Sequence, residues 1–191
     1  QVAIETHDAP SADAAILALL RRQGAEQGRT LEDGLQTRMR LWWDRLELED
    51  VALVASPLDP TGDAVACLAR WRLDALRADD AAAMTGLAAR SPGARTTALT
   101  AAAAAHLGSG HPTEALEILD DLIPTLELES THDFAAHQIL DLTRALRVKA
   151  LVAAGQHERG LDAARRLRTE LTPDLLPAIL VEEVLGHAER S

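Results

Sequence analysis

Gly110–Leu116 reads GHPTEAL, and Gly155–Leu161 reads GQHERGL, 45 residues further along the chain. Each stretch starts with a glycine, has a small residue five positions later, at Ala115 or Gly160, and then a leucine. Single glycines between periodic segments commonly mark turns. Each stretch therefore predicts a turn between two antiparallel helices, and two such turns in register predict a repeat of helix pairs.

The pattern continues past the turn, where an apolar residue follows four positions after the small one. A looser copy begins 32 residues before Ala115. The positions assigned to the repeat are Ala83, Leu87, Ala115, Leu119, Gly160 and Ala164. A small side chain is needed where two helix axes approach to about 8–10 Å, and the larger residue fills the next layer.

From Thr61 to Leu171 the chain thus resembles a tetratricopeptide repeat, although the repeat lengths of 32 and 45 residues differ. The resemblance implies a right-handed stack of antiparallel helix pairs, an α-solenoid. The expected pairs are 62–77 with 80–90, 94–108 with 112–126, and 132–154 with 157–170. A last helix is expected to start at Thr172-Pro173-Asp174, because threonine caps helices and proline suits the first helical position.

Composition supports an all-α fold of about nine helices. Alanine and leucine supply most of a 47% hydrophobic content, whereas aromatic residues make up 2%. We expect an N-terminal helical cap at 1–60 that is continuous with the stack, three tetratricopeptide-like pairs at 61–171, and a capping or connector helix at 172–191. A short β-strand within Val51–Leu58 is the alternative at the end of the first segment.

Net charge and cysteine content restrict the partners. A net charge of −11 disfavours nucleic acid and anionic lipid surfaces. The basic residues Arg159, Arg165, Arg166 and Arg168 alternate with acids and are interpreted as a solvated, ion-paired helix face. Cys67 stands among apolar residues and is interpreted as a small core side chain. No stretch is apolar for long enough to span a membrane, so the expected location is cytoplasmic, with no membrane partner.

A search for chemistry finds no catalytic motif, and we expect no cofactor and no enzymatic activity in this chain. The strongest metal-site pattern is Asp133, His137 and Asp141, whose spacing places them near one helical face. Glu183 and His187 form a second pair of this kind. Both patterns also fit a hydrated helix surface, and we expect no metal.

The last helix carries the stripe Val181, Val184 and Ala188, which is suited to a dimer contact or a connector. The chain starts at Gln1. Its last residues, which include Leu185, Ala188, Glu189, Arg190 and Ser191, resemble the junction after the N-terminal region of bacterial signalling proteins such as diguanylate cyclases. A helical region before the DNA-binding domain of a transcription regulator would end similarly.

These features predict a non-catalytic regulatory or sensory module of a larger signalling protein, acting through a protein or peptide partner or through its own copy. The alternatives are a stand-alone peptide- or protein-binding scaffold, and a small-ligand or enzymatic pocket near Trp42, Trp43 and Trp71.

Overall fold

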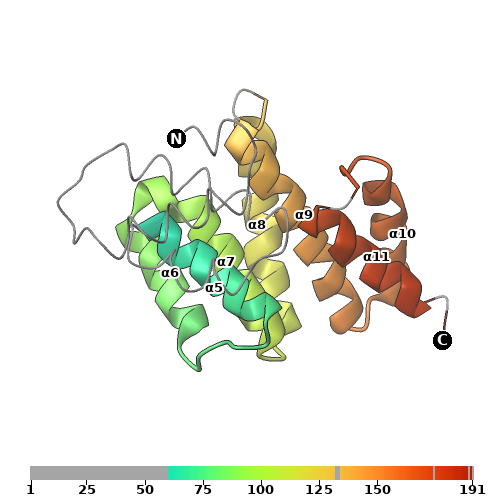
Figure 1. The fold of residues 1–191 in the computed structure, drawn as a ribbon, viewed down its shortest axis with the longest axis horizontal. Coiled ribbons are helices and arrows are strands. Elements are labelled where there is room, and N and C mark those ends of the chain that lie inside the picture. Colours follow the sequence, from blue (N-terminus) through green and yellow to red (C-terminus); the bar gives the residue numbers. More distant parts are fainter. Residues whose placement is uncertain (1–59, 132–133, 174, 189, 191) are drawn as a thin grey trace, which may run out of the picture. The chain divides into compact units, whose positions relative to one another are not determined.

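The computed structural model describes residues 60–131, 134–173, 175–188 and 190 (Figure 1). Every regular element in these residues is a helix, with no strand among them, which confirms the all-α prediction. The α-helices are α5 (Pro60–Arg72), α6 (Asp80–Arg90), α7 (Arg95–Gly108), α8 (Pro112–Glu129), α9 (Phe134–Ala153), α10 (His157–Arg168) and α11 (Leu176–Ala188). A short 3-10 helix, Pro92–Ala94, precedes α7.

Each of the seven stretches expected to be helical after Thr61 overlaps one of these helices, although α5 ends at Arg72 and not at residue 77, and α8 continues to Glu129. The chain divides into two compact units, Gln1–Glu47 and Leu48–Ser191, and the described residues belong to the second. The expected N-terminal helical cap at 1–60, with its strand alternative at Val51–Leu58, lies outside the described residues except for Pro60, which begins α5.

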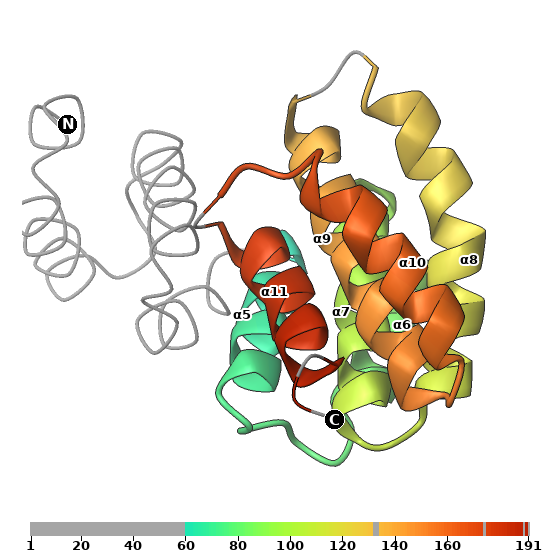
Figure 2. The ribbon, with the colours of Figure 1, turned by 90° about the vertical axis from the view of Figure 1, so that its right-hand side faces the viewer.

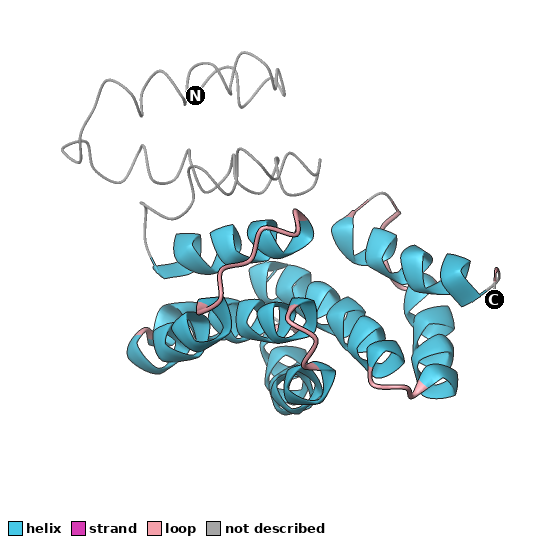
Figure 3. Ribbon diagram, turned by 90° about the horizontal axis from the view of Figure 1, so that it is seen from below, coloured by secondary structure: helices cyan, strands magenta, loops and turns pink. Residues whose placement is uncertain are grey.

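Helices pack in a regular order along the second unit. Each helix contacts the next one in the chain, and the odd-numbered helices also contact one another in sequence, α5 with α7, α7 with α9 and α9 with α11. In Figure 3, α5 and α11 lie on the same side of the remaining described helices. In Figure 1, α9 runs between α8 and α10, and in Figure 2 α10 lies in front of α9. Because connections such as residues 109–111 and 154–156 are short, consecutive helices run antiparallel.

The odd-numbered helices α5, α7 and α9 end in the same hydrogen-bonded turn, a Schellman motif. Its longer bond runs from Ala75 N–H to the Arg70 carbonyl, from His111 to His106, and from Gln156 to Leu151, at 2.8, 2.9 and 2.9 Å. The left-handed residues of the three turns are Asp74, Gly110 and Gly155, with φ of 54°, 80° and 78°. The sequence therefore predicted two of these turns and missed the first, where aspartate takes the place of glycine.

The repeat positions in α8 and α10 are closely packed. Ala115, Leu119 and Ala164 are fully buried. A Cβ on Gly160 would lie 2.6 Å from the Val152 Cγ2 atom, so α9 and α10 approach each other closely only because this residue is glycine.

The earlier copy requires a correction. Leu87 is buried, but Ala83 is exposed, and the buried residues of α6 are Asp80, Met84, Leu87 and Ala88. The alignment fails because Ala83 lies nine positions after Asp74, whereas Ala115 lies five positions after Gly110. The longer connection presents a different face of α6 to the core.

The centre of the unit is rich in alanine. Helix α7 buries Ala98 and the run from Ala101 to Ala105. Within this aliphatic surface, the Oγ1 atoms of Thr100 and Thr143 lie 3.0 Å apart and join α7 to α9 by a hydrogen bond. Each hydroxyl also lies within 3.0 Å of the carbonyl four residues earlier, which satisfies the remaining donor.

Helix α11 begins at Leu176, later than the Thr172-Pro173 start that was predicted. Pro177 is its second residue, where the missing N–H would have no partner within the helix, so no kink is required. Val181 and Val184 are buried within the chain, whereas Ala188 is exposed. The interpretation of this stripe as a dimer contact is therefore wrong for the two valines, which pack in the core.

Candidate functional site

The predicted metal ligands do not form a cluster where the structure describes them. His137 Nε2 lies 3.7 Å from Asp141 Oδ2, and the histidine is exposed, while Asp133 lies outside the described residues. Burial raises the pKa of Asp141, and the charges of His137 and Arg144 oppose that effect. No group of three or more potential His, Cys, Asp or Glu ligands occurs among the described residues.

Glu183, the other candidate carboxylate, binds cations instead of pairing with His187. Its carboxylate accepts hydrogen bonds from Arg72 at 2.5 Å and from Lys149 at 2.7 Å, and so links α11 to α5 and α9. His187 Nδ1 lies 3.1 Å from the Glu183 backbone carbonyl. Burial would raise the pKa of Glu183, but the hydrogen bonds and charges of Lys149 and Arg72 outweigh it and hold that pKa below its usual value.

The tryptophan pocket is not supported at Trp71, the one tryptophan that the structure describes. Trp71 is buried, and its Cδ1 would lie 2.9 Å from a Cβ on Gly108, so its ring packs tightly against α7. The Lys149 Nζ atom lies 6.0 Å from the ring centroid, at the limit of a cation–π contact. Trp42 and Trp43 lie outside the described residues.

Cys67 is fully buried and lies 3.9 Å from the Ala101 carbonyl, as expected of a core residue. Burial, assisted by the charge of Asp80, raises the pKa of its thiol to about 12. Asp80 is itself buried, and Arg70 donates two hydrogen bonds to it at 3.1 and 2.5 Å. Both groups are therefore parts of the core.

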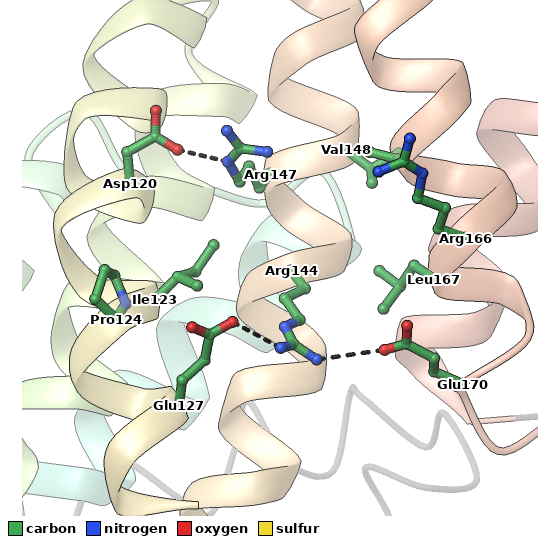
Figure 4. Close-up of a pocket in the computed structure, with 11 residues that line it drawn as sticks. Asp120, Ile123, Pro124, Glu127, Arg144, Arg147, Val148, Arg166, Leu167 and Glu170 are labelled. Atoms are coloured by element: carbon green, nitrogen blue, oxygen red, sulfur yellow. Dashed lines mark hydrogen bonds and ion pairs between the residues drawn. The ribbon is translucent and has the colours of Figure 1, made fainter.

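A groove of about 470 Å³ runs across the face of α9 between α8 and α10 (Figure 4). Its apolar lining consists of Ile123 and Pro124 from α8, Val148 from α9, and Ala163 and Leu167 from α10. Its charged lining consists of Asp120, Glu127, Arg144, Arg147, Arg166 and Glu170.

Two arginines of α9 are held in fixed positions in this groove. Arg147 donates a hydrogen bond to Asp120, and Arg144 lies between Glu127 at 2.7 Å and Glu170 at 3.5 Å (Figure 4). These ion pairs are part-exposed, so each contributes at most about 1 kcal/mol to stability. Their main effect is to orient the side chains that surround the apolar lining.

Arg166 differs from both, since it forms no side-chain hydrogen bond or ion pair with any described residue. Other members of the basic group do have partners: Arg165 pairs with Asp162 at 3.1 Å, and Arg168 lies 4.0 Å from Glu182. The ion pairing predicted within this helix is therefore found at Arg165, and Arg166 takes no part in it.

Sequence reasoning did not predict the groove itself. The signal available for it was Pro124 inside α8, with acids four residues before it and three after it on the same face. Proline supplies no N–H to the helix, so its position in the middle of α8 indicates a surface where the helix is not completely regular.

Comparisons with protein-family models, curated proteins and solved structures give no match to the chain. None of the described helices has both the length and the apolar content needed to cross a membrane.

Proposed function

We propose that this chain is a non-catalytic helical-repeat module that binds a segment of a partner protein in the groove between α8 and α10. The single observation that carries the proposal is the groove. It is open, five apolar residues line it, and its charged side chains project from α9 and from the segments packed on either side of it. Binding sites for peptide segments commonly combine an apolar floor with a few oriented polar groups.

The proposed architecture is a right-handed tetratricopeptide-like α-solenoid. Two observations support it: the Schellman turn that ends α5, α7 and α9, and the contacts of each odd-numbered helix with the next odd-numbered one. In a solenoid each repeat contacts its neighbours and leaves extended surfaces for partners. The proposal applies equally to a stand-alone scaffold, because the groove is formed within residues 120–170.

We further propose that the module regulates a larger signalling protein, in agreement with the resemblance of its last residues to a domain junction. Helix α11 supports this role, because it packs against α9 and α10, two of the helices that form the groove. Reading the coding sequence past the codon for Ser191 tests the idea. An open frame that enters an output domain is expected, and an immediate stop codon would contradict it.

Site-specific photo-crosslinking tests the binding function. p-Benzoylphenylalanine replaces Pro124, which is exposed in the groove, and in a control variant it replaces Thr125, which is exposed but does not line it. After irradiation in the native host, we expect a discrete adduct from position 124 and none from position 125. The partner, identified by mass spectrometry and purified, should then bind the purified chain saturably. Equal adducts from both positions, or none from either, would refute binding in the groove.

A further inference from the structure

We propose that the occupant of this groove is a short acidic segment of a partner protein, whose carboxylate binds Arg166. This inference rests on the proposed binding function and names the chemistry of the partner. It follows from the distribution of charge over the side chains that α8, α9 and α10 contribute to the groove.

The acids that line the groove form ion pairs with Arg144 and Arg147 of α9. Asp120 accepts from Arg147, and Glu127 and Glu170 both lie against Arg144. Arg166 is the remaining cation, and no described acid pairs with it. In Figure 4 its guanidinium projects from α10 near Val148, and no dashed line joins it to the other side chains drawn. A guanidinium is always charged and presents parallel N–H donors that match a carboxylate.

A second cation lies on the same side of α10. Arg159, Ala163 and Arg166 follow one another at spacings of four and three, which places them along one stripe of α10. Arg159 hydrogen-bonds to the neutral amide of Gln156 and to no described acid. Arg159 and Arg166 are seven residues apart, about 10.5 Å along the helix axis.

This spacing indicates the form of the acidic segment. In a polyproline II conformation, residues i and i+3 lie on the same side of the chain and about 9 Å apart. Two acidic residues in that relation can therefore reach both Arg159 and Arg166, while the residues between them contact the apolar lining at Ala163 and Val148. The chain as a whole has a net charge of −11, so an acidic ligand is repelled elsewhere and this helix provides a local exception.

The test is a nuclear magnetic resonance titration of the full ¹⁵N-labelled chain with the peptide acetyl-Glu-Pro-Leu-Glu-amide. The matched probe is acetyl-Lys-Pro-Leu-Lys-amide, which has the same apolar centre and the opposite charge. We expect saturable shifts at the Arg166 side-chain Nε–H and at the backbone amides of α9 and α10 with the acidic peptide only. Equal shifts with the lysine peptide, or no saturable shift with either, would overturn the inference.

Two variants locate the binding. Arg166→Gln should weaken the acidic peptide at least tenfold, while Arg165→Gln, which removes an exposed charge already paired with Asp162, should change its affinity less than twofold. Ala163→Phe fills the groove without changing charge and should also weaken the peptide at least tenfold. An equal loss in both arginine variants would show that only the general field of α10 matters, and would refute a specific site at Arg166.

The outcome separates this inference from the proposed function. If crosslinks form from position 124 but the acidic peptide does not bind, the groove receives a partner of different chemistry and only the inference fails. If neither result is obtained, both fail.

Discussion

Replacing Asp80 with alanine removes one partner of the most deeply buried ion pair among the described residues. The side chains of Asp80 and Arg70 are only 5% and 13% exposed, and a further hydrogen bond of 2.8 Å reaches Asp80 from the Arg77 backbone N–H. The pair joins the last turn of α5 to the first residue of α6. Without the carboxylate, the Arg70 guanidinium remains buried and unpaired.

The expected loss follows from that burial. Breaking a buried ion pair by removing one member lowers the free energy of unfolding by about 3–5 kcal/mol, most of it from the uncompensated charge. For a chain of this size, each 1 kcal/mol shifts the melting temperature by about 2–4 °C. A loss at the lower end of this range, about 3 kcal/mol, therefore lowers the melting temperature of Asp80→Ala by roughly 6–12 °C.

Thermal unfolding followed by circular dichroism at 222 nm measures the effect. The matched control is Asp79→Ala, because Asp79 is the adjacent exposed acid and makes no side-chain capping bond, so a change below about 0.5 kcal/mol is expected. The double variant Arg70→Met with Asp80→Leu should lose less stability than Asp80→Ala alone, since neither charge then remains buried. Equal melting temperatures for Asp80→Ala and Asp79→Ala would refute the reasoning.

Three further predictions concern packing, pH and thiol chemistry. Gly160→Ala should destabilise the fold by about 1–3 kcal/mol in urea unfolding, because its Cβ would clash with Val152. Gly186→Ala should instead stabilise the fold by about 0.5–1 kcal/mol, because its Cβ meets only the end of a flexible arginine at 3.6 Å. Destabilisation by both substitutions would contradict the contact assigned to Gly160. The pKa of Glu183 is lowered on folding, so its stabilising contribution is complete above its usual pKa of 4.5 and disappears as pH falls through the lowered value. The Glu183→Gln variant should therefore lose less stability than the native chain between pH 6 and pH 3. Identical pH profiles would argue against the ion pairs of Glu183 with Arg72 and Lys149. Cys67, with a pKa of about 12, should react with a disulfide reagent at pH 8 only after unfolding, and rapid reaction of the folded chain would show that the thiol is accessible.

The helices of the second unit were predictable because their signals are local. Alanine and leucine at helical spacing, the glycines of the turns and Pro112 at the start of α8 determine elements without reference to distant residues. The first Schellman turn was missed because Asp74 adopts the left-handed conformation, which aspartate does less often than glycine. The longer connection after this turn is the reason that the sequence alignment of Ala83 with Ala115 did not hold in the structure.

The candidate site was not predictable in the same way, because its side chains come from three separate helices. Arg144 and Arg147 look like exposed basic residues in the sequence, and their partners Glu127 and Asp120 lie 17 and 27 residues earlier. Likewise, the pair Asp79-Asp80 looks like a solvated helix start, although Arg70 buries one of its members. Arg166 remains unpaired because of the way in which α8, α9 and α10 pack together, and the sequence alone does not show that packing.

The hydrogen bond between Thr100 and Thr143 has a consequence for how α7 and α9 find their alignment. The buried surface of α7 is mostly alanine and therefore nearly uniform, so its apolar side chains distinguish little between registers that differ by one turn. In a shifted arrangement each hydroxyl would keep only the carbonyl of its own helix, whereas the observed one adds a buried hydrogen bond of 3.0 Å between the two hydroxyls. Two buried oxygens therefore favour one longitudinal register for the central helices.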